Sequence, residues 1–284
     1  MSKQSMSIDQ VLALYDRDQR QEVDYFDVRR EVTPYVTRLL PLSDLEPEGA
    51  IIHSRLDEAN VDQVIQAEVA YFEELGIDLE WKVYDYDRPP DLRARLVAHG
   101  FQAEEPEAVL ALDLNEAPAI LWRPVTPDVR RISGPDEVQH VKEVEEAVWQ
   151  EDFGQLAQRL AQHLLQDPGH LSVYVAYVGE LPVSAAWIVF HEQGQFASLW
   201  GGSTRPDYRQ RGLYTALVAI RAQEARRRGV RFLAVDASPM SRPILEKYGF
   251  RWLTYAHACK WPARPTQPGG VATRQQIGQR RQVG

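Results

Sequence analysis

The spacing of apolar and polar residues predicts a strand, a turn and a helix between residues 196 and 229. Residues 196–204 are apolar and aromatic, as expected of a buried strand, and Pro206-Asp207 marks the turn that follows. From Leu213 the apolar residues recur at helical spacing. One stripe of this helix is apolar and contains Leu213, Leu217 and Ile220. The charged residues fall largely off this stripe: Arg221, Glu224 and Arg228. Gly229 predicts the helix end, because glycine readily takes the left-handed conformation that terminates helices.

Similar patterns predict alternating strands and helices along the rest of the chain. In the second half we predict strands at 129–132, 171–178, 182–190, 230–235 and 252–261, and helices at 136–149, 153–165 and 238–250. In the first half we predict helices at 61–75 and 91–100, and strands at 50–53, 79–86 and 108–114. Residues 1–48 combine one helical pattern, a charged stretch and three prolines, which predicts one or two helices and a loop.

Part of this order occurs twice, at an offset of 149 residues. Six identities fall within fifteen positions: Asp87/Asp236, Pro90/Pro239, Arg93/Arg242, Leu96/Leu245, Gly100/Gly249 and Phe101/Phe250. Repeated domains leave such a trace. We therefore predict two domains of one fold, with chance similarity between two short helices that end in Gly-Phe as the alternative.

Charge is unevenly distributed between the two halves. Residues 1–128 carry 12 Lys and Arg against 27 Asp and Glu, whereas residues 129–262 carry 16 against 14. An acidic half argues against a nucleic-acid partner, which requires a basic face. It would attract cations such as protonated amines; an acidic surface that only maintains solubility is the alternative.

The remaining composition indicates a cytoplasmic protein. No apolar run has the length of a membrane span, and residues 1–10 have no signal-peptide core. The single cysteine, Cys259, excludes an internal disulfide and agrees with a reducing compartment. The histidines are scattered without metal-ligand spacing, so we expect no metal and no membrane partner.

The glycines in two stretches around the predicted turn indicate special backbone conformations. In residues 209–214 (RQRGLY), Gly212 permits a tight turn, so that consecutive N–H groups point outward at the positive end of the helix and can bind phosphate oxygens. Gly201-Gly202 would weaken the middle of the strand, and therefore predicts a bulge or a close backbone approach. Relief of packing under Trp200 is the alternative.

These residues resemble a known family. Arg209-x-x-Gly212-x-Tyr214 is similar to the (Gln/Arg)-x-x-Gly-x-(Gly/Ala) loop of the GNAT superfamily, the acyl-CoA-dependent N-acyltransferases. Residues 204–209 (TRPDYR) resemble the family segment that leads into this loop, and residues 238–250, which end in Gly-Phe, resemble its closing helix. The resemblance covers residues 129–262.

The resemblance and the repeat together imply an α+β fold of two GNAT-like domains in tandem. Each is expected to contain a mixed, mostly antiparallel central sheet flanked by helices. We expect a degenerate GNAT-like domain at 1–115, a proline-rich linker at 116–128, a GNAT acetyltransferase domain at 129–262 and a disordered tail at 263–284.

The resemblance also implies acetyl-CoA as co-substrate. Nothing before the 61–75 helix offers an Arg-x-x-Gly loop, so only the second domain is expected to bind it. The expected cofactor-binding residues are Ser203, Thr204, Arg209, Gln210, Arg211, Gly212, Leu213, Tyr214, Thr215 and Ser238. Tyr214 replaces a small residue of the family, so its side chain must point away from the phosphates or wall the site. A backbone N–H near Gly201 and Gly202 is the expected oxyanion donor.

The proton-transfer groups are less evident. An alkylamine with a pKa of about 10.4 is neutral only in about one part in 2,500 at pH 7, so a base is needed. The predicted core strand has no carboxylate, which leaves Glu151 and Asp152 on the acceptor side and Asp236 after the second strand; a surface acid or a helix cap is the alternative for each. The family's acidic tyrosine corresponds to Leu245, and Tyr248 would replace it only if the helix were rotated.

The expected function is transfer of an acetyl group from acetyl-CoA to a primary amine, most simply of a small molecule, by direct attack in a ternary complex. Protein lysine or N-terminal acetylation and a non-catalytic acyl-CoA-binding regulator are the alternatives. Cys259 lies beyond the closing Gly-Phe without an assignable histidine–acid pair, which predicts no acyl-enzyme; His257, two residues away, keeps a covalent route open.

Overall fold

The computed structural model describes residues 5–25, 27–43, 45 and 48–262, and these form two compact units. The C-terminal unit comprises residues 5–14 and 109–253, and the N-terminal unit comprises residues 15–108 and 254–262. The tail predicted at 263–284 lies outside the described residues. No helix of the described chain has both the length and the apolar character needed to cross a membrane.

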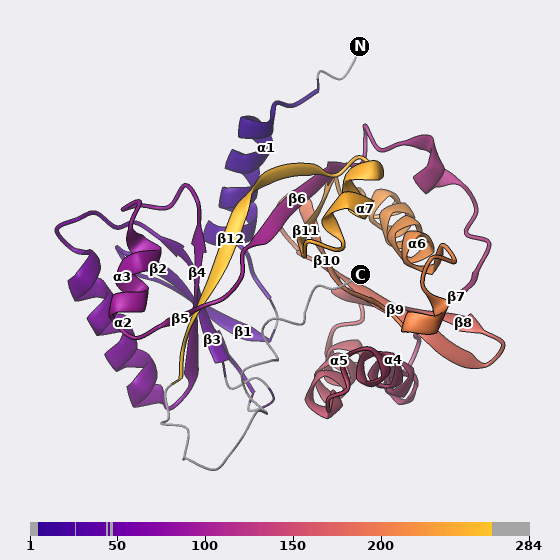
Figure 1. Cartoon of the computed structure of the whole chain (residues 1–284), viewed down its shortest axis with the longest axis horizontal. Coiled ribbons are helices and arrows are strands. Elements are labelled where there is room, and N and C mark those ends of the chain that lie inside the picture. Colours follow the sequence, from indigo (N-terminus) through magenta and orange to yellow (C-terminus); the bar gives the residue numbers. More distant parts are fainter. Residues whose placement is uncertain (1–4, 26, 44, 46–47, 263–284) are drawn as a thin grey trace. The chain divides into compact units, whose positions relative to one another are not determined.

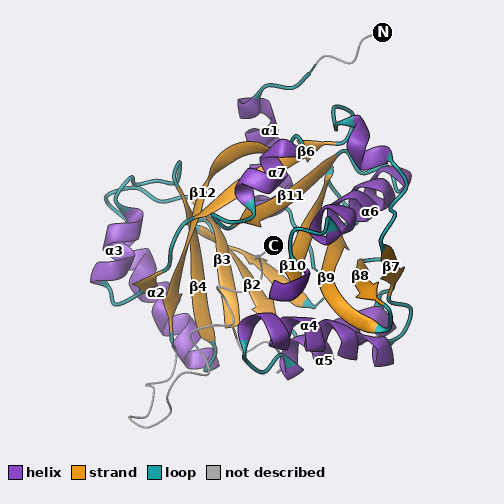
Figure 2. Ribbon diagram, turned by 45° about the vertical axis from the view of Figure 1, so that its right-hand side comes forward, coloured by secondary structure: helices purple, strands orange, loops and turns teal. Residues whose placement is uncertain are grey.

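The C-terminal unit is a sheet with helices on both faces (Figures 1 and 2). Its strands run in the order β6 (Glu107–Asp113), β11 (Phe232–Ala237), β10 (Phe196–Thr204), β9 (Leu181–Phe190), β8 (Leu171–Val178) and β7 (Asp128–Arg131). Its helices are α1 (Ile8–Tyr15), α4 (Gln139–Trp149), α5 (Gly154–Gln166), α6 (Leu213–Arg227) and α7 (Arg242–Lys247). Strands β7 to β10 are antiparallel, and β10 runs parallel to β11 through α6. Helices α4 and α5 cover one face and α6 the other.

The N-terminal unit repeats this plan. Its strands run in the order β1 (Val28–Val32), β2 (Val36–Pro41), β3 (Glu48–Ser54), β4 (Asp78–Tyr84) and β12 (Arg251–Trp261), with β5 (Gln102–Ala103) also paired to β12. Its helices are α2 (Val61–Leu75) and α3 (Leu92–Ala98), preceded by a π-helical segment at Asp16–Gln21. Strands β1 to β3 are antiparallel, and β3 runs parallel to β4 through α2.

The repeat predicted from the sequence is confirmed in the fold. The order β10-α6-β11-α7 of one unit corresponds to β3-α2-β4-α3 of the other. The glycine after each short helix has a positive φ, 89° at Gly249 and 100° at Gly100. The following phenylalanines, Phe250 and Phe101, are both 3% exposed. Chance similarity does not account for the same backbone conformation and burial at matched positions.

The last strand of each copy lies in the sheet of the other unit. Strand β6 follows the first Gly-Phe in sequence but lies beside β11, and β12 follows the second Gly-Phe but pairs with β4 from Ala256↔Tyr84 to Trp261↔Leu79. The compact units therefore differ from the contiguous ranges 1–115 and 129–262. Each exchanged strand pairs with a strand that would otherwise be an edge.

One expectation for the first half was wrong. Residues 28–41 form the antiparallel hairpin β1–β2, whose residues are paired from Val28↔Pro41 to Val32↔Thr37, and not a loop. Pro34 falls in the turn and Pro41 at the end of β2, where a proline does not interrupt the ladder. The charged residues that hid the pattern lie on the more exposed strand, β1.

Candidate functional site

Strand β10 carries the bulge predicted at its two glycines. Gly201 pairs with Ala186 and Ser203 with Ala185, so Gly202 is the extra residue. The φ angles are 66° at Gly201 and 106° at Gly202. A Cβ atom on Gly201 would lie only 2.7 Å from Cε3 of Trp187. The predicted bulge is confirmed. The group that approaches Gly201 closely is the side chain of Trp187 and not a backbone, so the glycine also relieves packing against an indole, which is that of Trp187 rather than Trp200.

The bulge lies beyond the point where β10 and β11 separate. Their parallel ladder covers three pairs, Phe196↔Phe232 to Ser198↔Ala234. In the described chain, the rest of β10 runs on to Thr204 without a pairing to β11. The peptide groups from 199 to 204 on that side are therefore not occupied by ladder hydrogen bonds to β11.

A buried arginine fixes the strands around the bulge. Arg221 on α6 is 2% exposed and its Nη1 donates to the carbonyl oxygens of Trp187 (3.0 Å) and Trp200 (3.1 Å). Burial lowers the pKa of Arg221 to about 10. The expectation that Arg221 and Glu224 lie off the buried stripe was wrong, because their partners are on neighbouring strands: Glu224 accepts hydrogen bonds from Ser172 and Tyr174.

The loop before α6 has the shape expected of an anion site. Gln210 and Gly212 have φ angles of 61° and 76°, and Gly212 begins α6 without a side chain that caps it. Within the described residues, the N–H groups of the first turn therefore have neither an intrahelical partner nor a capping side chain. Arg209 donates to the carbonyl of Thr204 and Arg211 to that of Asp207, so both side chains are held by the loop's own backbone. This arrangement fits a pyrophosphate.

Of the other residues expected at the cofactor, Tyr214 and Thr215 lie in the first turn of α6. Tyr214 is half-buried near Arg221, and burial raises its pKa to about 12. Oγ1 of Thr215 lies 2.9 Å from the hydroxyl of Tyr248, which places that tyrosine at the first turn of α6. Ser238 Oγ accepts the N–H of Ser241 and so stabilises the turn before α7. Leu245 is 1% exposed and belongs to the core.

The three acids proposed as bases have different surroundings. Asp152 is exposed, and its Oδ1 accepts the N–H of Gly154 (2.9 Å) at the start of α5. Glu151 is half-buried beside it. Asp236 is 7% exposed near the end of β11. Within the described residues, no group of three or more His, Cys, Asp and Glu is placed to hold a metal ion.

A fourth acid, which the sequence reasoning missed, contacts the strand beside the bulge. Glu145 on α4 is 2% exposed, and its Oε2 accepts hydrogen bonds from Ser203 Oγ (2.7 Å) and Trp149 Nε1 (3.1 Å). Its Oε1 has no hydrogen-bond partner in the described chain. A signal was available, because Glu145 falls on the helical stripe of Val141 and Val148.

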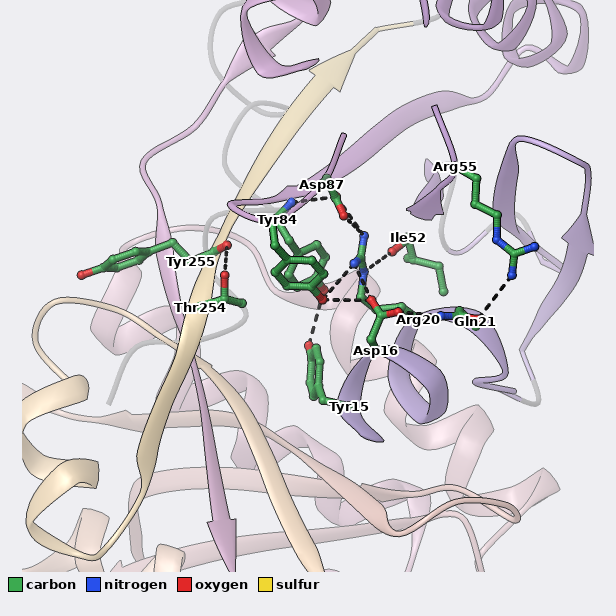
Figure 3. A network of polar contacts seen from close by, with 11 residues as sticks. Tyr15, Asp16, Arg20, Gln21, Ile52, Arg55, Tyr84, Asp87, Thr254 and Tyr255 are labelled. Carbon is green, nitrogen blue, oxygen red and sulfur yellow. Dashed lines mark hydrogen bonds and ion pairs between the residues drawn. The ribbon is translucent and has the colours of Figure 1, made fainter. Parts of the chain in front are cut away.

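The N-terminal unit has a bulge at the matching place. Thr37 pairs with His53 and Arg38 with Ile51, so Ile52 is the extra residue of β3. Figure 3 shows Arg20 directed at this bulge: its Nε donates to the carbonyl of Ile52 (2.8 Å) and its Nη2 to both carboxylate oxygens of Asp87 (2.9 Å).

The start of α2 also differs from that of α6. The carboxylate of Asp57 accepts the N–H groups of Ala59 (2.9 Å) and Asn60 (3.0 Å), just before the helix begins at Val61. An acidic side chain of the chain itself therefore occupies the end of the helix that would attract an anion.

Comparison with known proteins agrees with this geometry. Residues 138–250 match the model of the family described as "Acetyltransferase (GNAT) family". A search of the curated proteins gave no match.

Solved structures extend the likeness to both units. A GCN5-related N-acetyltransferase from Kribbella flavida is 14% identical, with a TM-score of 0.63 over 92% of this chain and 97% of that one. A tandem GNAT protein from the clavulanic acid biosynthesis pathway is 12% identical, with a TM-score of 0.60 over 91% and 95%. A GCN5-related N-acetyltransferase from Sphaerobacter thermophilus is 14% identical, with a TM-score of 0.57 over 92% and 87%. The chain therefore has the tandem GNAT fold.

Proposed function

We propose that this protein is an N-acetyltransferase that transfers the acetyl group of acetyl-CoA to the primary amine of a small molecule. The observation that carries the proposal is the glycine-started, uncapped N-terminus of α6 next to a bulged β10 that separates from β11. The first feature fits the pyrophosphate of acetyl-CoA, and the second fits a thioester beside strand N–H groups. GNAT proteins use acetyl-CoA, so the match of residues 138–250 to the GNAT family model supports acetyl-CoA as the co-substrate of this chain.

In this proposal the loop and the strand hold the two ends of acetyl-CoA. Backbone N–H groups of residues 210–215 bind the pyrophosphate, and the pantetheine follows β10 from Thr204 towards the bulge. There a backbone N–H of Gly201 or Gly202 donates to the oxyanion that develops as the amine attacks the carbonyl carbon. Such donors are in place before the reaction begins because the bulge is already fixed by Trp187 and Arg221.

Release of CoA follows from the attack of the amine. The amine nitrogen forms a bond to the carbonyl carbon, the C–S bond breaks and the sulfur leaves as a thiolate. Leu245 has no proton to give, whereas Tyr248 carries a hydroxyl at the first turn of α6. We assign Tyr248 as the residue that protonates the thiolate where protonation is needed.

Direct transfer is supported by the state of the cysteine. Cys259 is fully buried, and burial raises the pKa of its thiol to about 12. The thiolate is the nucleophilic form, so this side chain is inert near neutral pH. A single buried cysteine also fits the reducing cytoplasm, where we place the enzyme.

We further propose one acetyl-CoA site in each chain. In the N-terminal unit Arg20 and Asp87 occupy the side of the β3 bulge, and Asp57 occupies the start of α2. A phosphate would meet a carboxylate there. This unit would then act as a degenerate copy without an acetyl-CoA site of its own.

Calorimetry with acetyl-CoA tests the binding part. We expect one site per chain, lost in Gly212→Pro because proline cannot adopt a φ of 76°. Gly179→Ala is the matched control, since Gly179 has a φ of 62° in the β8–β9 turn, away from the loop. Two sites per chain, or full binding by Gly212→Pro with an intact helical spectrum, would refute the assignment.

Release of CoA in the presence of butylamine, spermidine, glucosamine, hydroxylamine and a lysine peptide tests the reaction. Acetylation of small amines supports the proposal, and exclusive acetylation of the peptide supports a protein acetyltransferase. Tight binding of acetyl-CoA with no acceptor-dependent release would instead indicate a regulator.

A further inference from the structure

We propose that Glu145, acting through Ser203, takes the proton from the acceptor amine. This inference rests on the proposed function, because it assigns the proton acceptor of the same reaction. Ser203 is the first residue of β10 after the bulge, and its hydroxyl donates to Glu145 Oε2 at 2.7 Å.

The surroundings of Glu145 are unusual for a buried acid. Its described polar contacts are Ser203 and Trp149, and neither is a cation. Glu224, a second buried acid of the same unit, has Arg228 at 2.6 Å in addition to two hydroxyl donors. Burying a carboxylate without a counter-ion costs free energy, so Glu145 is not explained by stability.

Charged groups on the elements around Glu145 do not neutralise it. On α4 itself, Lys142 pairs with Glu146 at 3.3 Å. The adjoining strands β9 and β10 contain no titratable residue, and Arg205, which follows β10, donates to the carbonyl of Glu143 on α4 (3.3 Å). Helix α5, which packs on α4, contributes Arg159 and His163, and neither is among the groups that shift the pKa of Glu145, which are burial, Ser203 and Trp149.

The second oxygen adds an independent observation. Oε1 of Glu145 is buried and has no hydrogen-bond partner in the described chain. A buried oxygen without a partner is rare in folded proteins and usually has a functional reason. In Glu145 it leaves Oε1 able to hold a proton while Oε2 still accepts from Ser203 and Trp149.

The proton step balances without any further reactant. The ammonium form of the acceptor gives a proton to Ser203 Oγ while the hydroxyl proton of Ser203 moves to Glu145. The carboxylate becomes a carboxylic acid, the serine stays neutral, and the amine becomes the neutral nucleophile that attacks the thioester. After transfer Glu145 returns this proton to solvent, and the second proton, which the nitrogen loses as it becomes an amide, passes to the departing thiolate by way of Tyr248.

The acidity of Glu145 matches this task. Burial raises its pKa to about 7, although the hydrogen bonds from Ser203 and Trp149 act in the opposite direction. A base with a pKa near the working pH is both available and strong enough to take a proton.

The test is the pH dependence of kcat/KM with butylamine, which is protonated at neutral pH, and with hydroxylamine, which is not. With butylamine the wild-type rate should rise through a pKa near 7 and then level off. Glu145→Gln keeps an oxygen that accepts from Ser203, but it should be about 10²–10⁴-fold slower at pH 7. Its rate should rise tenfold per pH unit up to pH 9, because only amine that is already neutral reacts. Glu145→Gln should acetylate hydroxylamine nearly as fast as the wild type does.

Two further variants separate proton transfer from a structural role. Ser203→Ala should show the same change of profile, whereas Glu224→Gln, which removes a buried carboxylate elsewhere in the unit, should retain the wild-type profile. A uniform loss with both amines at every pH would assign Glu145 a packing role and overturn the inference. Wild-type rates in Glu145→Gln would do the same. If acetyl-CoA binds but neither amine is acetylated by the wild type, the proposed function fails, and this inference fails with it.

Discussion

Gly201→Ala is the substitution that most directly tests the proposed oxyanion site. Gly201 has a φ of 66°, a conformation that L-residues adopt at a cost of roughly 1–2 kcal/mol. The added methyl would also lie 2.7 Å from Cε3 of Trp187, an indole that is 4% exposed. Overpacking of this kind costs about 1–3 kcal/mol. We therefore expect Gly201→Ala to lower the free energy of unfolding by about 2–5 kcal/mol.

A matched glycine separates the two contributions. Gly179 has nearly the same φ, 62°, but no atom lies within 4 Å of the position of its absent Cβ. Gly179→Ala should therefore show only the backbone cost, roughly 1–2 kcal/mol. Trp187→Phe removes part of the indole, so the cost of Gly201→Ala should be smaller in that background, with a coupling of about 0.5–3 kcal/mol.

Urea unfolding of the wild type, the three single variants and the double variant measures these differences in stability, and CoA release with butylamine measures the activity of the site. A displaced oxyanion donor should lower kcat by about 10²–10³ in Gly201→Ala, with little change in Gly179→Ala. Equal costs of unfolding for the two glycine substitutions would show that Trp187 does not press on the bulge. Full kcat in Gly201→Ala would show that the bulge does not hold the oxyanion donor.

Four other outcomes follow from the structure. The pKa of Glu145 is raised from 4.5 to about 7 in the folded protein. The stability that the protonated carboxyl group contributes is therefore fully present below about pH 4.5 and is lost as the pH rises through 7. In urea unfolding, Glu145→Gln should match the wild type at pH 4 and exceed its unfolding free energy by about 3 kcal/mol at pH 9. Asp87→Ala leaves Arg20, 1% exposed, without its bidentate partner, and denaturant unfolding should show a loss of about 3–5 kcal/mol. Cys259→Ala should keep kcat within a few-fold, with intersecting initial-rate lines, whereas parallel lines and lost activity would indicate an acyl-enzyme. Residues 116–284 alone should be recovered as insoluble or unfolded protein, because β11 loses its neighbour β6; a soluble fragment with full activity would exclude any role for the N-terminal unit.

The features that were predictable from the sequence are local ones. Helical periodicity placed α6 and α2 at their observed starts, Leu213 and Val61, because a stripe of apolar residues is visible within one element. The bulge was predictable because two adjacent glycines weaken a strand unless its backbone must bend or approach a neighbour closely there. The hairpin β1–β2 was missed because charged residues on an edge strand give no alternation to detect.

The features that were not predictable depend on partners far away in the chain. Arg221 and Glu224 are charged residues of types that usually lie on the surface. In the interior, Arg221 donates to carbonyl groups of β9 and β10, and Glu224 accepts from hydroxyl groups of β8. Glu145 gives a weaker local signal than Glu151 and Asp152, because its partner Ser203 is 58 residues away. The exchange of β6 and β12 has no sequence signal at all, since either strand has a pattern that suits either sheet.

Comparison of the two units explains how one copy can keep the fold without the proposed site. The β3 bulge persists at Ile52, but the carbonyl it exposes accepts a hydrogen bond from Arg20, and Asp87 balances the charge of that arginine. At the start of α2 the carboxylate of Asp57 takes the place that an anion would need. The polar groups that a ligand would satisfy in the C-terminal unit thus have partners from the chain itself. Buried peptide groups are costly when they are left unpaired, so loss of a ligand site requires such replacements. We assign acetyl-CoA to the C-terminal unit for two reasons. Such replacements are present at both ends of the β3–α2 connection of the N-terminal unit, and in the described chain no side chain caps the helix that begins after Gly212.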